Sequence, residues 1–385
     1  LLRKRETETA TVSYSELLFD LIYVFSVTQL SHYLLHNLTW EGLLKETILW
    51  FAVWMLWQHT IWVTNWFNPD TRPIRILLML VGLVMAAAIP YAFTYRGLIF
   101  AVCYVLIQAG RTLYIIGVLG DHHLAANFKR IMGWFCISAV FWITGAILQG
   151  EWQILLWIIA AICDYTAPMH GFALPRLGRS DSSKEWTIEG HHLVERCQLF
   201  VIIAFGETLL MTGASLSEVE EWTPLVIISA VISFIGSLAM WWVYFDVSSE
   251  AGSRKIQEVK DPGKLGLIYN AIHIVLVGAL IICAVGDELI VAHPEQEMRA
   301  EVVFVLIIGP IVYILANSIY KYVTCRMLPL SHIIAVIALA LLLPWPYHIS
   351  LLTMNILVTS VFIFVIVFDM LFPNKGFKIK WEPKI

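Results

Sequence analysis

Apolar runs of about twenty residues recur along the whole chain and are separated by shorter polar segments. A helix needs about 20 apolar residues to cross a hydrocarbon core roughly 30 Å thick. Helices also satisfy every backbone polar group inside a bilayer. The pattern therefore predicts an all-α integral membrane protein with about twelve transmembrane helices. The predicted spans cover residues 15–36, 43–66, 73–93, 97–119, 127–149, 151–168, 190–213, 223–246, 264–286, 301–321, 328–346 and 349–372.

Positive charges gather on alternate connections between these spans. If the first polar segment is cytoplasmic, twenty of the 25 Lys and Arg residues lie in cytoplasmic segments or at span ends. Cytoplasmic loops of membrane proteins carry such an excess. We therefore expect an inner-membrane-type protein with both termini in the cytoplasm. The first span carries acidic residues and lacks a small-residue cleavage site, so we expect it to be retained rather than removed as a signal peptide.

Two similar segments predict an internal repeat. The sixth span ends in Asp164-Tyr-Thr-Ala-Pro168 and the twelfth in Asp369-Met-Leu-Phe-Pro373, so both read Asp-x-x-x-Pro. Six helices in each half would keep the two repeats parallel. We also expect Asp164 and Asp369 to occupy equivalent positions. The predicted divisions are a first repeat at 1–168, a cytoplasmic connection at 169–189, a second repeat at 190–372 and a cytoplasmic tail at 373–385.

Composition narrows the class of protein. Hydrophobic residues make up 59% of the chain and charged residues 14%, against roughly 45–50% and 25% in a soluble domain. The net charge of −4 includes no basic block, which argues against a nucleic-acid partner. No nucleotide-binding or hydrolase motif occurs, and the six Cys form no CxxC pair, so no cofactor is expected. The expected partners are the lipid bilayer and an unidentified small solute or ion, and a homodimer is left open.

Ionisable side chains inside a span are costly and mark candidate functional positions. The first span places Glu16 and Asp20 one helical turn apart, on one face. In the seventh span Glu207 lies about 18 Å beyond Glu195 along the helix axis. The candidates for solute binding, ion binding or proton relay are Glu16, Asp20, Gln29, His32, Arg111, His192, Glu195, Arg196 and Glu207. The plainer alternative is that the acidic and His groups cap helices or extend to the cytoplasmic rim.

Two of these expectations concern partners. Arg111 lies inside the fourth span and needs a carboxylate, for which Glu207 and Asp20 are the candidates. Glu207 itself would then be a paired structural group, and without a cation it would carry protons. We also expect the first and seventh helices to be neighbours at a pseudo-twofold axis. A metal held by His192 and Glu195 is a weaker alternative, because no second such pair occurs.

Several long motifs resemble the bacterial low-temperature-requirement A family. They are residues 16–32, 62–66, 110–113 and 188–207. The resemblance extends from about residue 12 to 372 and implies a multi-pass bacterial membrane protein associated with growth at low temperature, with no settled substrate. At His191 the family more often carries a small residue, which leaves His192 the better candidate.

Three classes of function remain open. The buried ionisable groups and the parallel repeats favour a secondary transporter or permease, with proton coupling as one form. The second class is a potassium or proton channel, because residues 19–28 resemble the first-helix signature of a six-helix-repeat family of potassium and proton-leak channels. The third is an intramembrane enzyme or lipid-handling protein that uses His192, Glu195 and Glu207.

Overall fold

The computed structural model describes residues 12–67, 72–181, 189–246, 261–344, 349–372 and 375–378. The described chain is predominantly helical, which confirms the all-α membrane architecture. Within it, nine helices are long and apolar enough to cross a bilayer, and two shorter apolar helices cover Ile76–Tyr91 and Leu330–Ala340. Residues 1–11, 182–188, 247–260 and 379–385 lie outside the described part, together with the predicted cytoplasmic charges that they carry.

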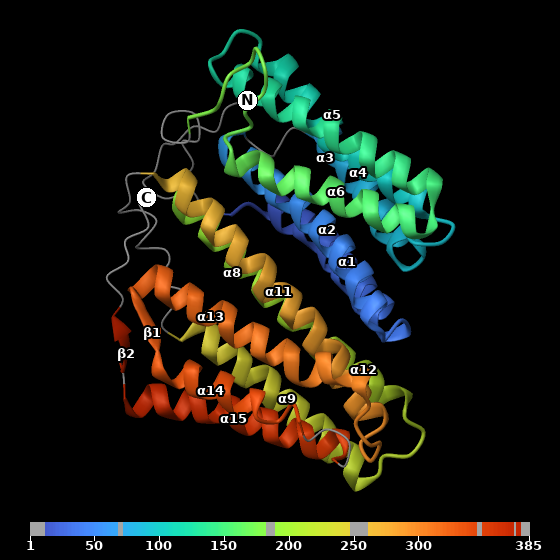
Figure 1. The fold of residues 1–385 in the computed structure, drawn as a ribbon, viewed down its shortest axis with the longest axis vertical. Coiled ribbons are helices and arrows are strands. Elements are labelled where there is room, and N and C mark those ends of the chain that lie inside the picture. Colours follow the sequence, from blue (N-terminus) through green and yellow to red (C-terminus); the bar gives the residue numbers. More distant parts are fainter. Residues whose placement is uncertain are drawn as a thin grey trace. The chain divides into compact units, whose positions relative to one another are not determined.

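The chain forms two compact units (Figure 1). The first comprises Leu1–Tyr33, Glu41–Arg196 and Lys260–Gly266, and the second comprises Leu34–Trp40, Cys197–Val259 and Leu267–Ile385. The division into repeats at 168 and 190 stays a prediction.

In the first unit, α4 packs against α5 and α5 against α6. Trp142 of α5 and Trp157 of α6 are fully buried there, and Trp157 Nε1 donates to the Trp142 carbonyl at 2.9 Å. The helices are α1 (Tyr14–His36), α2 (Trp40–Trp66), α3 (Arg72–Ala88), η1 (Ile89–Tyr91), α4 (Gly97–Leu119), α5 (Leu124–Leu148), α6 (Gly150–Met169) and the start of α8 (Gly190–Glu218).

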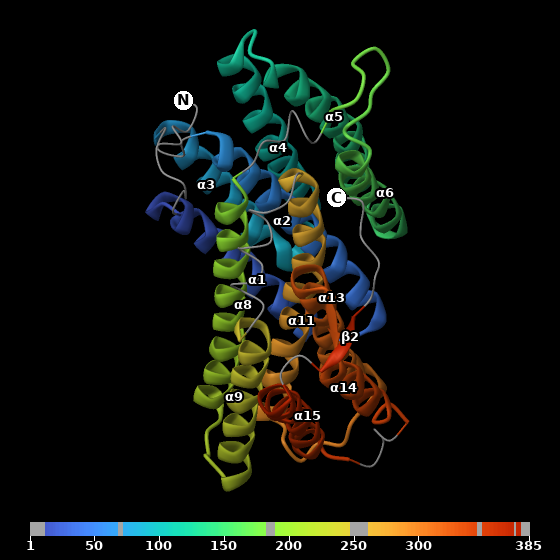
Figure 2. The same cartoon turned by 90° about the vertical axis from the view of Figure 1, so that its left-hand side faces the viewer.

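In the second unit, α9 and α15 lie side by side (Figure 2), and α14 packs against α13 and α15. The backbone changes from α-helical to π-helical at η2, just before Pro310. The elements are α9 (Pro224–Phe245), α11 (Pro262–Ala292), α12 (Ala300–Val303), η2 (Phe304–Ile308), α13 (Gly309–Cys325), β1 (Met327–Pro329), α14 (Leu330–Ala340), α15 (Leu351–Leu371) and β2 (Gly376–Lys378).

Some predicted boundaries are wrong. Helix α11 continues six residues past the predicted end at 286, because Val291 is apolar and packs on Val226 and Ala230. Helix α14 is shorter than its predicted span and ends at Ala340. Residues 376–378, predicted as part of a simple tail, form β2, which pairs antiparallel with β1.

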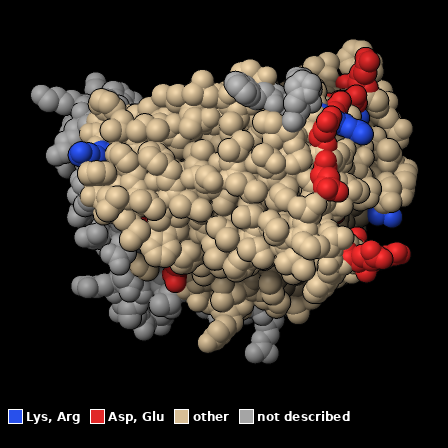
Figure 3. Space-filling model, turned by 90° about the horizontal axis from the view of Figure 1, so that it is seen from below, with Lys and Arg blue, Asp and Glu red and all other residues tan. Residues whose placement is uncertain are grey.

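Helix α9 shows how apolar surface is distributed. Its exposed side chains include Val231, Phe234 and Leu238, whereas Ser233 and Ser237 are buried. This is the reverse of a soluble helix and is typical of a helix that faces lipid on one side and protein on the other. Figure 3 shows one face of the molecule with a broad expanse of uncharged residues and acidic side chains gathered toward one edge. Such a surface is suited to a bilayer.

Candidate functional site

The candidate site is built around Glu16, in the first turn of α1. The Ser13 backbone N–H and hydroxyl donate to Glu16 Oε2 at 2.9 and 3.0 Å, and the Glu16 N–H donates to Ser13 Oγ at 3.3 Å. This reciprocal pair is a Ser-x-x-Glu capping box. The other oxygen, Oε1, lies 2.9 Å from His192 Nε2 and 3.1 Å from Arg196 Nη1. One carboxylate therefore both starts α1 and joins it to α8.

Asp20 lies one turn further along α1. Its Oδ1 accepts from Arg196 Nη2 at 2.6 Å and from Trp57 Nε1 at 2.8 Å. His192 and Arg196 are also one turn apart, so two pairs spaced by four residues face each other across the two helices. This confirms that the first and seventh helices are neighbours at their first turns. The pseudo-twofold axis stays a prediction.

Asn65, near the end of α2, fixes the start of α8. Its Nδ2 donates to the Glu189 carbonyl at 2.8 Å, and its Oδ1 accepts from the Glu189 N–H at 2.7 Å. The Glu189 carboxylate in turn accepts from the His192 N–H at 2.7 Å. Asn65 Nδ2 also lies 3.4 Å from His192 Nδ1. The imidazole is thus held between Asn65 on one side and Glu16 on the other.

The charges of this network do not balance without a proton. Glu16, Asp20, His192 and Arg196 are each at most 1% exposed. Two carboxylates face one permanently charged guanidinium, so the net charge is −1 when the imidazole is neutral and zero when it is protonated. Asp20 Oδ2 and Arg196 Nε have no hydrogen-bond partner within the described residues. The network therefore leaves one acceptor and one donor that a ligand could contact.

Of the two carboxylate partners predicted for Arg111, Asp20 is wrong, and the pairing with Glu207 of the second unit stays a prediction. Arg111 lies in α4, and Asp20 pairs with Arg196 instead. The guanidinium of Arg111 donates to Thr60 Oγ1 at 2.6 Å, to the Leu56 carbonyl at 3.4 Å and to Gln108 Oε1. These partners are neutral: α2 contributes a hydroxyl and a carbonyl oxygen, and α4 contributes an amide oxygen.

Within the first unit, Gln29, His32 and Glu195 do not join this network. Gln29 is half-buried and His32 exposed, about 14 and 18 Å beyond Asp20 along α1. Glu195 is half-buried, and its Oε2 has no hydrogen-bond partner among the described residues. Glu207 is buried and belongs to the second unit. No group of three or more potential metal ligands occurs among the described residues.

Sequence reasoning missed Trp57 and the pairing role of Asn65. Tryptophans are common in this chain and were interpreted as packing groups, so nothing distinguished Trp57. The Ser13-x-x-Glu16 spacing is a recognisable capping signal that would have fixed the start of α1. Asp164, a buried carboxylate outside this network, accepts from Tyr104 OH at 2.7 Å and Trp142 Nε1 at 3.1 Å.

Comparison with known proteins decides the family. A family model described as "Bacterial low temperature requirement A protein (LtrA)" matches residues 11–367. The chain belongs to the LtrA family. The match includes every residue of the network, and it confirms the resemblance seen in the motifs. The LtrA chain is also 36% identical over 344 residues to an uncharacterized protein of Rhizobium meliloti (strain 1021), covering 87% of this chain and 83% of the relative. No solved structure matches it.

Proposed function

We propose that this LtrA protein is a proton-coupled secondary transporter of a small solute or ion in the bacterial inner membrane. The observation that carries the proposal is the buried network in which Arg196 bridges Glu16 and Asp20 while His192 contacts Glu16. Ionisable groups at membrane depth are expensive, and those that are retained mark ion or substrate pathways and proton relays. Through its family, we also propose that the protein supports growth at low temperature.

Proton coupling follows from the charge of the network. Protonation of His192 would supply a second positive charge, so the two carboxylates would no longer depend on Arg196 alone. A bound ligand could then contact Asp20 Oδ2 or Arg196 Nε, which lack partners within the described residues. Loss of the proton would restore the competition for Arg196. Binding of solute and proton are then thermodynamically linked, and each changes the affinity for the other by the same factor.

We further propose twelve crossings in two parallel six-helix repeats with cytoplasmic termini. In support, Asp164 of α6 is bonded from α4 and α5, and Asp369 of α15 is bonded by Lys321 of α13 and Ser331 of α14, at 3.1 and 2.5 Å. Each carboxylate thus uses the two preceding helices of its half. Single Cys residues introduced at 181 and 221 of a Cys-free variant test the orientation, since an impermeant thiol reagent added outside cells should label only position 221.

The functional test uses purified protein in vesicles that contain a pH-sensitive dye and are held at an inside-negative potential. Amino acids, organic acids, sugars, polyamines and inorganic ions are added outside one class at a time. We expect one class to trigger saturable proton entry in the wild type, and His192→Gln to abolish the proton movement while solute binding remains. The matched control is His191→Gln, which changes the adjacent, half-buried imidazole.

Other outcomes would overturn the proposal. Potassium or proton flux that needs no added solute and does not saturate would identify a channel. Absence of any flux in folded protein, with chemical conversion or redistribution of the vesicle lipids, would identify an enzyme or lipid-handling protein.

A further inference from the structure

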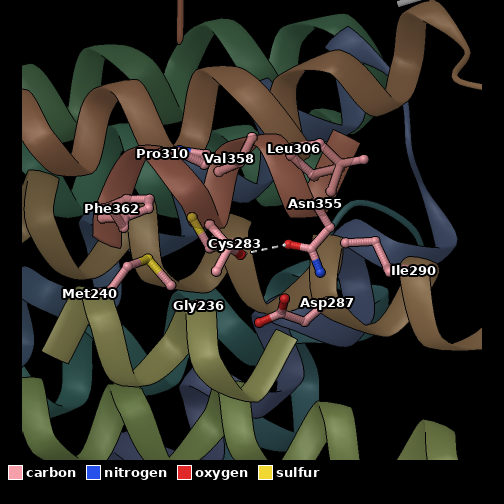
Figure 4. Close-up of a pocket in the computed structure, with 12 residues that line it drawn as sticks. Gly236, Met240, Cys283, Asp287, Ile290, Leu306, Pro310, Asn355, Val358 and Phe362 are labelled. Carbon is pink, nitrogen blue, oxygen red and sulfur yellow. Dashed lines mark hydrogen bonds between the residues drawn. The ribbon is translucent and has the colours of Figure 1, made fainter. Parts of the chain in front are cut away.

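The second unit contains a small cavity that shares no residue with the Arg196 network. Its volume is about 30 Å³, and roughly 10–15 Å³ is enough to admit one water-sized particle. Asp287 of α11, Asn355 and Thr359 of α15, and Gly236 of α9 line it. Figure 4 shows the Asp287 carboxylate close to the Asn355 amide, with Cys283 beside them. Polar groups from separate helices thus meet at a space large enough for a dehydrated ion.

The oxygens at and beside this cavity form a set of two hydrogen-bonded groups. Ser237 Oγ donates to Asp287 Oδ2 at 3.4 Å, and Asn355 Nδ2 donates to Ser233 Oγ at 2.9 Å. Thr359 Oγ1 donates to Asn355 Oδ1 at 3.3 Å. A hydroxyl or amide oxygen that takes part in one such bond keeps a lone pair for another partner. The set therefore offers carboxylate, hydroxyl and amide oxygens, which are ligands for hard cations.

Asp287 carries the only charge on the described cavity lining, which holds no Lys, Arg or His. A buried carboxylate must be protonated, paired with a cationic side chain or neutralised by a bound cation. One carboxylate supplies one negative charge, which a monovalent cation balances. Divalent ions are held by more charge or by several retained waters, for which this cavity is too small.

An irregular backbone lies against the same cavity. Val305 and Leu306 of η2 line it, and so does Pro310 at the start of α13. In an α-helix, the Leu306 carbonyl would accept from the N–H of the residue four positions later. That residue is Pro310, which has no N–H. Irregular helical backbone at membrane depth is tolerated where it lines a cavity, and in transporters such carbonyls coordinate Na⁺. This feature points to a ligand independently of the polar side chains.

We propose that this cavity is a Na⁺ site in which Asp287 supplies the charge and the surrounding hydroxyl and amide oxygens complete the coordination. The site goes beyond the proton-coupled network of the first unit. Because binding of Na⁺ can be measured without transport, the site stands or fails independently of the proposed function.

The test measures Na⁺ binding to purified full-length protein in lipid nanodiscs. Thermal unfolding, followed by tryptophan fluorescence, is compared in NaCl, KCl and choline chloride at equal ionic strength, and radioactive Na⁺ binding is measured alongside. We expect the unfolding midpoint to rise with the logarithm of the Na⁺ concentration and not with K⁺ or choline, because a ligand of the folded state stabilises it. Binding of radioactive Na⁺ should saturate. Asp287→Asn should weaken binding on the order of 100-fold and Ser237→Ala about tenfold.

Two further variants keep the result interpretable. Gly236→Ala would place a Cβ 3.0 Å from Thr359 Oγ1, so it should weaken Na⁺ binding without removing a ligand. Ser229→Ala is the control, since this buried hydroxyl of α9 donates to the Leu225 carbonyl at 2.7 Å, whereas Ser237 donates to Asp287. If Asp287→Asn fails to fold, Ser237→Ala and Gly236→Ala decide. Equal midpoints in NaCl and choline chloride, an equal response to K⁺, or stabilisation by acid alone would each overturn the site.

Discussion

The Arg196 network of the first unit and the cavity of the second unit hold their carboxylates differently. In the first, Glu16 and Asp20 share Arg196, a cation that belongs to the chain. In the second, Asp287 contacts Ser237 and lies beside Asn355, with no cationic side chain on the cavity lining. A carboxylate with a built-in cation contributes to the stability of the fold. A carboxylate without one costs stability until an ion or proton arrives, and this cost makes it a binding site.

The largest effect should come from removing the built-in cation. Arg196→Met removes the guanidinium that both buried carboxylates contact, and loss of one member of a buried ion pair costs about 3–5 kcal/mol. We expect a corresponding fall in the thermal unfolding midpoint. Adding Glu16→Gln and Asp20→Asn to Arg196→Met should recover most of the loss, because the uncompensated charges are gone. A triple variant as unstable as the single one would show that Arg196 acts through packing instead.

The two units should respond with opposite signs to the same chemical change. Asp20→Asn removes a charged partner from Arg196 and should destabilise by about 1.5–3 kcal/mol. Asp287→Asn in sodium-free medium removes a charge that has no cationic side chain on the cavity lining, so stability should rise or stay unchanged. Unfolding midpoints of both variants in choline chloride measure the difference. Destabilisation of similar size in both would erase the contrast between the units.

A smaller effect is expected at Asn65. Asn65→Ala removes two hydrogen bonds to the backbone of Glu189, which together stabilise by about 2 kcal/mol. Because these bonds position His192, the variant should also weaken solute-triggered proton entry in vesicles. Asn355→Ala is the counterpart in the second unit and should change Na⁺ binding without changing proton entry. Loss of proton entry in both variants would contradict the separation of the two sites.

The smallest effect should follow from removing the helix cap. Ser13→Ala should cost about 1 kcal/mol, as expected for loss of an N-cap hydroxyl. Ser217→Ala, which changes an exposed hydroxyl bonded to the Ala214 carbonyl, should leave the unfolding midpoint unchanged. A larger loss in Ser13→Ala than in Asn65→Ala would show that Glu16 depends on its cap to contact His192.

The sequence predicted the part of the site that periodicity encodes. Glu16 and Asp20 are spaced by one turn and were predicted to share a face. His192 and Arg196 have the same spacing, but only their residue types marked them as candidates. Which atoms would meet depended on packing between helices. Arg111 donates to neutral oxygens on α2 and α4. No pattern in the sequence predicts that Trp57 contacts Asp20.

Asp287 was missed for a definite reason. The predicted span ended at 286, where Asp287 and Glu288 interrupt the apolar run, so both were assigned to a loop. The helix continues because the next residues are apolar and Val291 packs against α9. A hydropathy window stops at charges, whereas a helix stops where backbone hydrogen bonding and packing end. Functional carboxylates at span ends are therefore the residues that such a window assigns wrongly.

The partners of Glu16 and Asp20 are synthesised at different times. Asp20 meets Trp57 after 37 further residues, but Arg196 follows Asp20 by 176. At roughly 5–20 residues per second, α1 waits on the order of ten seconds or more before its cation is made. Until then the ribosome and the insertion machinery handle a helix with two uncompensated acids. The ion pairs to α8 are thus a closing step in the biogenesis of the first unit.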